Sequence, residues 1–240
     1  MVSVLAVSDE VDEALCVDPG LARGVDIILA CGDLPFDYLG YLMDALERPL
    51  VFVPGNHDQD VRGYRTARSG LTLRAGMPSE PPWPPGAVNA DGRVVDVAGL
   101  RIAGLGGSLR YSDGPNQYSQ RAQTRRARRL ARRAMFRRWR DGGPVDVVLT
   151  HAPPCGVGDG DDLPHRGFDC LGSLIARVRA QLLLHGHIHP IGDHPPDLRL
   201  GGAVVRNVVG KHVFDIPSGA DMSPAPGERS QTGAPNSVTP

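Results

Sequence analysis

Asp26-Ile27-Ile28-Leu29-Ala30-Cys31-Gly32-Asp33 is the stretch of sequence that decides the fold. A short, continuous run of aliphatic and β-branched residues is typical of a strand buried on both faces, and this one ends at a glycine and an aspartate. Two further runs, at residues 2–7 and 50–53, also end at polar residues. Between the second and third runs, the apolar residues of 36–46 recur at helical spacing. Strands that alternate with helices predict a parallel sheet.

The rest of the chain extends this α/β pattern. Working outward, we predict a first crossover helix over 11–22, a long surface connection over 62–91, a hairpin of 94–97 with 101–105, a helix over 118–140, a strand over 145–149, a helix over 171–178, a strand over 181–184 and a closing hairpin of 203–208 with 212–216. Residues 218–240 are rich in Pro, Gly, Ser and Thr and contain few apolar residues. We therefore expect one domain over residues 1–217, followed by a disordered tail over 218–240.

Composition narrows the class of protein. A chain of 240 residues is long enough for one domain with a substantial core. The 26 Lys and Arg residues nearly balance the 27 Asp and Glu residues, so overall charge gives no argument for nucleic acid or an anionic membrane as partner. The 4 cysteines form no CxxC pair, and no apolar run reaches membrane-spanning length. With no recognisable signal peptide, we expect a cytoplasmic protein without a membrane segment, and the oligomeric state stays open.

Polar residues that can bind metal ions follow five of the predicted strands. They are Asp9, Asp33, Asn56, His151, and the pair His187 and His189. Because ligands bind outside the carboxyl ends of the strands in open α/β sheets, these scattered residues are expected to converge. Each of them alone has an ordinary explanation, such as a helix cap or a turn. Their joint occurrence at successive strand ends predicts a site for divalent metals such as Mn, Fe or Zn.

Four short motifs sharpen this prediction: Gly32-Asp33, Gly55-Asn56-His57-Asp58, Thr150-His151 and Gly186-His187-Ile188-His189. Their types and order resemble those of the calcineurin-like metallophosphoesterases, and the resemblance extends over residues 1 to about 217. It implies a four-layer α/β/β/α sandwich of the metallophosphoesterase type. It also implies two bound divalent metal ions, with Mn²⁺, Fe²⁺/Fe³⁺ and Zn²⁺ as candidates.

The resemblance implies a role for each residue. Asp33 would bridge the two metal ions. The second ion would also bind Asn56, His151 and His187, and the first ion would bind Asp9 and His189. His57 would contact the substrate phosphate and protonate the leaving oxygen, and Asp58 would orient His57. The implied reaction is hydrolysis of a phosphate ester by a metal-activated hydroxide.

The sequence departs from the family pattern at the first metal. The family usually has Asp-x-His here, whereas this chain has Asp9-Glu10-Val11, and valine cannot bind a metal. We favour a first metal that binds more weakly, with water in the open position. Two alternatives stay open: substitution by Glu10, Asp12 or His165, or a mononuclear or inactive site. If the strand continues past Asp9, the side chain of Glu10 should point away from Asp9. This argues against Glu10 as a replacement for the missing histidine.

The class of substrate and a competing function also depend on local motifs. The phosphate-binding arginine of the GDxxDRG motif of related protein phosphatases is missing after Asp33, so the chain looks nearer to the phosphodiesterase-like bacterial branch. We therefore predict a phosphodiesterase, with phosphomonoesters as the other option. The competing function is a catalytically weakened binding protein on the same scaffold. It would bind nucleic acid through the Arg-rich helix at 121–140, although a solvated cationic face over an apolar stripe explains this helix more simply.

Two pairs of loop residues complete the candidates. His165 and Arg166 follow His151 in a glycine-rich loop, and Arg110 and Tyr111 follow a Gly-Gly turn. Either pair would line the pocket and hold the scissile phosphate, or would simply be exposed on the surface.

Overall fold

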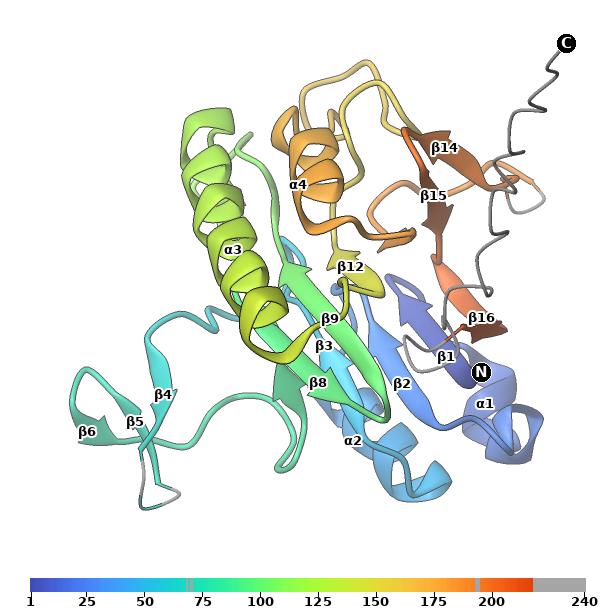
Figure 1. The fold of residues 1–240 in the computed structure, drawn as a ribbon. Helices are drawn as coiled ribbons and strands as arrows, with labels where there is room; N and C mark the ends of the chain where they lie inside the picture. Colours follow the sequence, from blue (N-terminus) through green and yellow to red (C-terminus); the bar gives the residue numbers. More distant parts are fainter. Residues whose placement is uncertain (68, 70, 193–194, 218–240) are drawn as a thin grey trace, which may run out of the picture.

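The computed structural model describes residues 1–67, 69, 71–192 and 195–217, so the expected tail at 218–240 lies outside the described residues. Within them the chain forms the mixed α/β fold that the sequence predicts, with two large sheets and helices on their outer faces (Figure 1). The helices are α1 (Glu13–Val17), the 3₁₀ turn η1 (Pro19–Ala22), α2 (Phe36–Leu46), α3 (Gln120–Asp141) and α4 (Cys170–Val178). No helix in the described ranges combines the length and the apolar character needed to cross a membrane.

The first sheet has the order β16-β1-β2-β3-β7. Its strands are β1 (Val2–Ser8), β2 (Ile27–Ala30), β3 (Leu50–Phe52), β7 (Val88–Asn89) and β16 (Gly210–Ile216). Strands β1, β2, β3 and β7 run parallel, and β16 pairs antiparallel with β1 over its whole length. The parallel pairing expected from the three apolar runs is therefore confirmed.

The second sheet has the order β14-β15-β13-β12-β9-β8. Its strands are β8 (Val94–Val97), β9 (Leu100–Leu105), β12 (Val147–Thr150), β13 (Leu182–His185), β14 (Leu198–Leu200) and β15 (Ala203–Asn207). The four central strands are parallel, and the two edge strands pair antiparallel. The predicted hairpin of β8 and β9 turns at Ala98 and Gly99, whose φ angles of 48° and 80° are both positive, as its two-residue turn requires.

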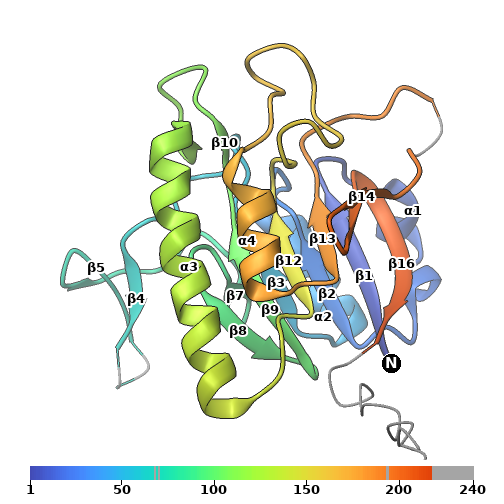
Figure 2. The same ribbon diagram turned by 45° about the horizontal axis from the view of Figure 1, so that its top comes forward.

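Three clusters of buried side chains hold the elements together. One joins the two sheets through residues such as Val4, Val51 and Leu149. A second lies between the first sheet and α1 and α2, and a third lies between the second sheet and α3 and α4 (Figure 2). The positions of these clusters are consistent with the four-layer α/β/β/α order that the family resemblance implies. That order stays an interpretation.

Two predicted connections are wrong in detail. The helix expected over 11–22 is divided into α1 and η1, because Pro19 disfavours helical geometry at Asp18, which has a φ of −137°. The segment 62–91 is more than a surface connection. It contributes β7 to the first sheet and forms a small sheet of β4 (Tyr64–Thr66), β5 (Thr72–Arg74) and β6 (Met77–Pro78).

The closing hairpin is also wrong. Both of its strands exist, but β15 pairs with β13 and β14 in the second sheet, whereas β16 pairs with β1 in the first. The chain crosses between the sheets at Val208 and Val209, which are buried. One short further parallel pair, β10 (Ser108–Leu109) with β11 (Gln117–Tyr118), lies beside the start of α3.

Candidate metal centre

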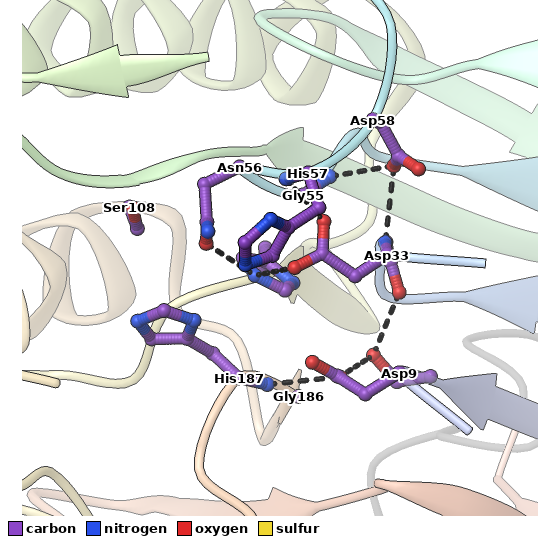
Figure 3. Close-up of polar contacts among 12 residues, drawn as sticks. Asp9, Asp33, Gly55, Asn56, His57, Asp58, Ser108, Gly186 and His187 are labelled. Carbon is purple, nitrogen blue, oxygen red and sulfur yellow. Dashed lines mark hydrogen bonds and ion pairs between the residues drawn. The ribbon is translucent and has the colours of Figure 1, made fainter. Parts of the chain in front are cut away.

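The predicted ligands lie where the carboxyl ends of the parallel strands of both sheets come together. Asp9, Asp33 and Asn56 follow β1, β2 and β3 of the first sheet, while His151 and His187 follow β12 and β13 of the second. Figure 3 shows Asp33 lying between Asp9 and Asn56.

Three of these residues adopt a backbone conformation that is unfavourable for side-chain-bearing residues. The φ angles are 61° for Asp9, 56° for Asp33 and 67° for His187. Such conformations persist only where the surroundings impose them, and they gather at functional sites. Here they turn the chain sharply after each strand, so that the side chains point into a shared space.

Neighbouring glycines permit this close approach. A Cβ atom at Gly55 would overlap the Asp33 carboxylate, and one at Gly186 would overlap Ser8 and the carboxylate of Asp9. The glycine that begins each of these two motifs is therefore required by the close approach of a neighbouring side chain rather than by a positive φ of its own.

Four donors form the half of the centre expected to hold the second metal. The His151 Nε2 atom lies 3.2 Å from Asp33 Oδ2 and 3.0 Å from Asn56 Oδ1. Ligand atoms of Asp33, His151 and His187 all lie within 4.8 Å of one another. A carboxylate, an amide oxygen and two imidazoles at this spacing fit a divalent transition metal.

Backbone carbonyls fix both imidazole rings of this half. The His151 Nδ1 atom donates to the carbonyl of Cys31 at 2.8 Å, and the His187 Nε2 atom donates to the carbonyl of Pro164 at 2.8 Å. A ring nitrogen that donates to a carbonyl leaves the opposite nitrogen free to bind a metal. Metal-binding histidines are typically oriented in this way, so the surroundings of the ligands also fit a metal ion.

Electrostatics couple the buried members of this half. Burial works to lower the pKa of His151, but the charge of Asp33 outweighs it and raises that pKa to about 9. Burial works to raise the pKa of Asp33, and the pairing with His151 lowers it. Burial, helped by the charge of His151, lowers the pKa of His187 to about 4, so this ring is neutral, as a ligand must be.

The half expected to hold the first metal is more open. The Asp9 Oδ2 atom accepts hydrogen bonds from Ser8 Oγ at 2.5 Å and from the backbone N–H of His187 at 2.9 Å. The Nε2 atom of His189 lies 3.9 Å from Asp9 Oδ1, while its Nδ1 atom bonds to Glu10 Oε1 at 2.9 Å. Both side chains of this last pair are more than half exposed.

We expected Glu10 to point away from Asp9; its carboxylate instead bonds to His189, another candidate ligand, although Glu10 does not line the pocket. The expectation assumed that the strand continues past Asp9, but β1 ends at Ser8 and the left-handed turn at Asp9 redirects the chain. The Glu10 carboxylate orients the ring of His189, as outer carboxylates do for metal-binding histidines.

The other residues considered as replacements for the missing histidine occupy different positions. Val11 is exposed. Asp12 caps α1 through the Leu15 N–H and pairs with Lys211 at 3.0 Å. His165 is held by Asp162 at 2.8 Å, and its ring lies 5.6 Å from that of His187.

A pocket of about 350 Å³ opens over the centre. It is lined by Asp9, Asp33, Asn56, His57, Tyr111, Pro164, His165, His187 and His189. Of the two loop pairs singled out in the sequence, one member of each reaches the pocket, whereas Arg110 and Arg166 are not among the lining residues. The Tyr111 hydroxyl accepts a hydrogen bond from Asn56 Nδ2 at 3.1 Å, which fixes Oδ1 of that amide toward His151.

The two predicted catalytic residues lie in different environments. His57 is exposed at the pocket, and its backbone N–H donates to Asp33 Oδ1 at 2.8 Å. Asp58 is buried, and its Oδ2 atom accepts from the backbone N–H groups of Gly55 at 2.8 Å and Asp33 at 3.1 Å. Its hydrogen bonds within the described residues thus hold the backbone of two motifs rather than the ring of His57. Burial is the main cause that raises the pKa of Asp58 to about 6.

Sequence reasoning missed the groups that orient the ligands. The carbonyls of Cys31 and Pro164 are backbone atoms, so no side-chain pattern identifies them. Glu10 was visible beside Asp9, and only the turn that brings it to His189 was not.

Comparisons with known proteins agree with this geometry. Calcineurin-like phosphoesterases match residues 9–190 as a family. No curated protein matches the chain in sequence. The chain is similar in fold to a crystal structure with 14% sequence identity and a TM-score of 0.56, over 87% of this chain and 90% of the other. It is also similar to the protein TT1561 of Thermus thermophilus, with 18% identity and a TM-score of 0.53 over 87% and 89% of the two chains. The chain belongs to the calcineurin-like phosphoesterase family.

Proposed function

We propose that this protein hydrolyses phosphodiesters with the help of two divalent metal ions of unequal affinity. Membership of the family supports a metal-dependent phosphoester hydrolase. The observation that carries the finer proposal is the position of Asp33, which pairs with His151 in one half of the centre and lines the same pocket as Asp9 of the other half.

The proposed ligands divide between the two halves. Asp33, Asn56, His151 and His187 would hold the second ion, and Asp33, Asp9 and His189 would hold the first. Bound there, the ions would activate water and stabilise charge on the phosphate oxygens. The side chains around the ions would supply the remaining contributions to catalysis, which are proton transfer and the positioning of the ligands.

His57 is the proposed proton donor to the leaving oxygen. It lies at the pocket, exposed to an incoming substrate, and its backbone is anchored on Asp33. Asp58 assists by holding the backbone of Gly55 and Asp33 in place. Tyr111 assists by keeping the Asn56 amide oxygen directed into the centre. A positioned general acid of this kind contributes about 10²–10⁴-fold to the rate.

The lining of the pocket supports a diester rather than a monoester. The lining residues include no arginine or lysine within the described part of the chain. A phosphomonoester carries a second negative charge, which such enzymes commonly bind with a bidentate arginine. A phosphodiester carries one charge and makes no such demand.

Metal counting combined with turnover tests the proposal. The protein is purified with Mn²⁺, its bound metal is measured, and an aryl phosphodiester and the matching monoester are assayed. We expect one ion to be retained on desalting, a second to bind at higher Mn²⁺ concentration, and faster turnover of the diester. Less than one ion per chain together with no turnover would contradict hydrolysis and leave the binding-protein alternative, which the valine at position 11 in place of the usual histidine favours.

Variants of the Asn56–Gln59 turn test the assignment of His57. His57→Ala should lower kcat by about 10²–10⁴-fold while leaving the metal content unchanged, because the side chain contributes a proton rather than a ligand. Gln59→Ala, an exposed change two residues away, is the control and should keep the wild-type kcat. Loss of metal in His57→Ala would contradict the assigned role.

A further inference from the structure

Seven of the arginines of α3 fall into two sets with different surroundings. The helix contains ten arginines and one aspartate. In the inner set, Arg126 pairs with Asp91, Arg133 donates to the carbonyl of Gly92, and Arg137 donates to the carbonyl of Val94. These contacts hold the helix against β8 of the second sheet and against the segment that precedes it. The inner arginines therefore have a structural role.

The outer set has no such role. Arg125, Arg128, Arg129 and Arg132 line a groove of about 300 Å³ together with Arg177 of α4. Among the residues that the structure describes, no hydrogen bond or ion pair is made by any of these five guanidinium groups. A neighbouring pocket is lined by two of these arginines, Arg128 and Arg177, and by one acidic residue, Asp169. Arginines four residues apart on a helix repel one another, so this concentration of charge does not stabilise the helix by itself.

Exposed aromatic rings continue the same face. Phe136 and Trp139 follow Arg132 by four and seven residues, which places them on the same side of the helix. They are 56% and 80% exposed, and their rings lie 5.8 Å apart. A tryptophan this exposed leaves a large apolar surface in water, and such surfaces commonly bind a partner.

From these two observations, we propose that the outer face of α3 binds single-stranded nucleic acid. Unpaired guanidinium groups match the charge of a phosphate backbone, and neighbouring exposed rings offer stacking platforms for bases. A duplex hides the faces of its bases, and an inorganic polyphosphate has none, so neither would use the rings. A helix of 22 residues is about 33 Å long, which is enough for several nucleotides. This binding is separate from the metal centre and goes beyond the proposed hydrolysis.

The charged part of the surface is tested by anisotropy of a fluorescein-labelled single strand of about 15 nucleotides, with the full chain in Mn²⁺. The variant carries Arg128→Gln, Arg129→Gln and Arg132→Gln. The control carries Arg23→Gln, Arg65→Gln and Arg199→Gln, exposed sites with the same total change of charge. We expect at least tenfold weaker binding for the variant and less than twofold change for the control. The slope of log affinity against log salt should fall by about 2, because each lost phosphate contact contributes about 0.7.

The aromatic part is tested by Trp139→Ala and by competition. We expect Trp139→Ala to weaken binding of the strand by about five- to a hundredfold, and polyphosphate of equal charge to compete poorly. Equal affinity for polyphosphate, or an unchanged affinity in Trp139→Ala, would overturn the assignment to nucleic acid. An equal loss in the variant and control triples would overturn the assignment to this face. The length of the strand, read on a gel, reports hydrolysis separately, so failure of catalysis and failure of binding are distinguishable.

Discussion

The two halves of the proposed metal centre differ in how firmly their candidate ligands are held. In the half built on His151 and His187, both rings are buried and each donates to a backbone carbonyl. In the half built on Asp9 and His189, the imidazole side chain is 57% exposed and is oriented by Glu10, which is 58% exposed. A ligand fixed by the buried backbone loses little freedom when a metal binds, whereas an exposed pair of side chains must be ordered. The difference predicts a tight second site and a weak first site.

Removing the residue shared by both halves should have the largest effect. Asp33→Asn loses the charge that pairs with His151 and the proposed bridge between the ions, so we expect activity and metal content to fall by more than about 100-fold. Metal analysis and turnover of an aryl phosphodiester measure this. Asp44→Asn, an exposed change on α2, should behave as wild type. Full metal content in Asp33→Asn would show that the halves are independent.

The pH dependence of metal binding should distinguish the buried half. The raised pKa of His151, about 9, means that a metal must displace one proton from this ring below that pH. Affinity for the tightly bound ion should therefore rise about tenfold per pH unit up to about pH 9 and then level off. Calorimetry at pH 7.5 in two buffers of different ionisation enthalpy counts the protons released. Binding without proton release would contradict the pairing of Asp33 with His151.

Restoring the family pattern should make the halves more equal. Val11→His places an imidazole where the resemblance expects a ligand of the first metal, so we expect the weaker site to tighten on the order of tenfold. Titration with Mn²⁺ measures the change, and Val11→Ala is the matched control. An unchanged second binding step would show that the turn after Asp9 directs position 11 away from the centre.

Weakening the orientation of His189 should have a smaller effect in the opposite direction. Glu10→Gln keeps the size of the side chain but removes its charge, so we expect about tenfold weaker binding at the first site only. Glu13→Gln, in the first turn of α1, is the control. Loss of the tightly bound ion in Glu10→Gln would contradict the division into two halves.

The smallest expected effect concerns the Asn56 amide. Tyr111→Phe removes the hydroxyl that accepts from Asn56 Nδ2, at a cost of about 1 kcal/mol, or roughly fivefold in affinity of the second site. The ring stays in place as part of the pocket. An unchanged affinity would mean that His151 alone orients this amide.

Most of the strands and helices, and the convergence of the candidate ligands, could be predicted from the sequence. Each apolar run is short and ends at a polar residue. The same stretch of sequence therefore predicts both the strand and the candidate ligand that follows it. The position of Glu10 could not be predicted, because it depends on one left-handed residue, Asp9, that composition does not reveal. The partners of β15 and β16 could not be predicted either, since apolar patterning identifies a strand but not its neighbour.

The helix α3 shows the same limit. The sequence predicts an apolar stripe of Ala127, Leu130, Ala131, Ala134, Met135 and Trp139. The first four are buried as expected, but Met135 and Trp139 are exposed, so the stripe is shorter than predicted. The division of its arginines was not visible, because it depends on Asp91 and Asp96, which lie in a different part of the chain.

The bond from His187 to the carbonyl of Pro164 has a consequence for cooperativity. Pro164 lies in the loop between β12 and α4, next to His165, which lines the pocket. A contact that orders this loop over the pocket would also order the ring of His187, a proposed metal ligand. By thermodynamic reciprocity, metal binding would then favour the ordered loop by the same factor. Substrate that contacts His165 and the metal held by His187 would therefore strengthen each other's binding, although they touch different residues.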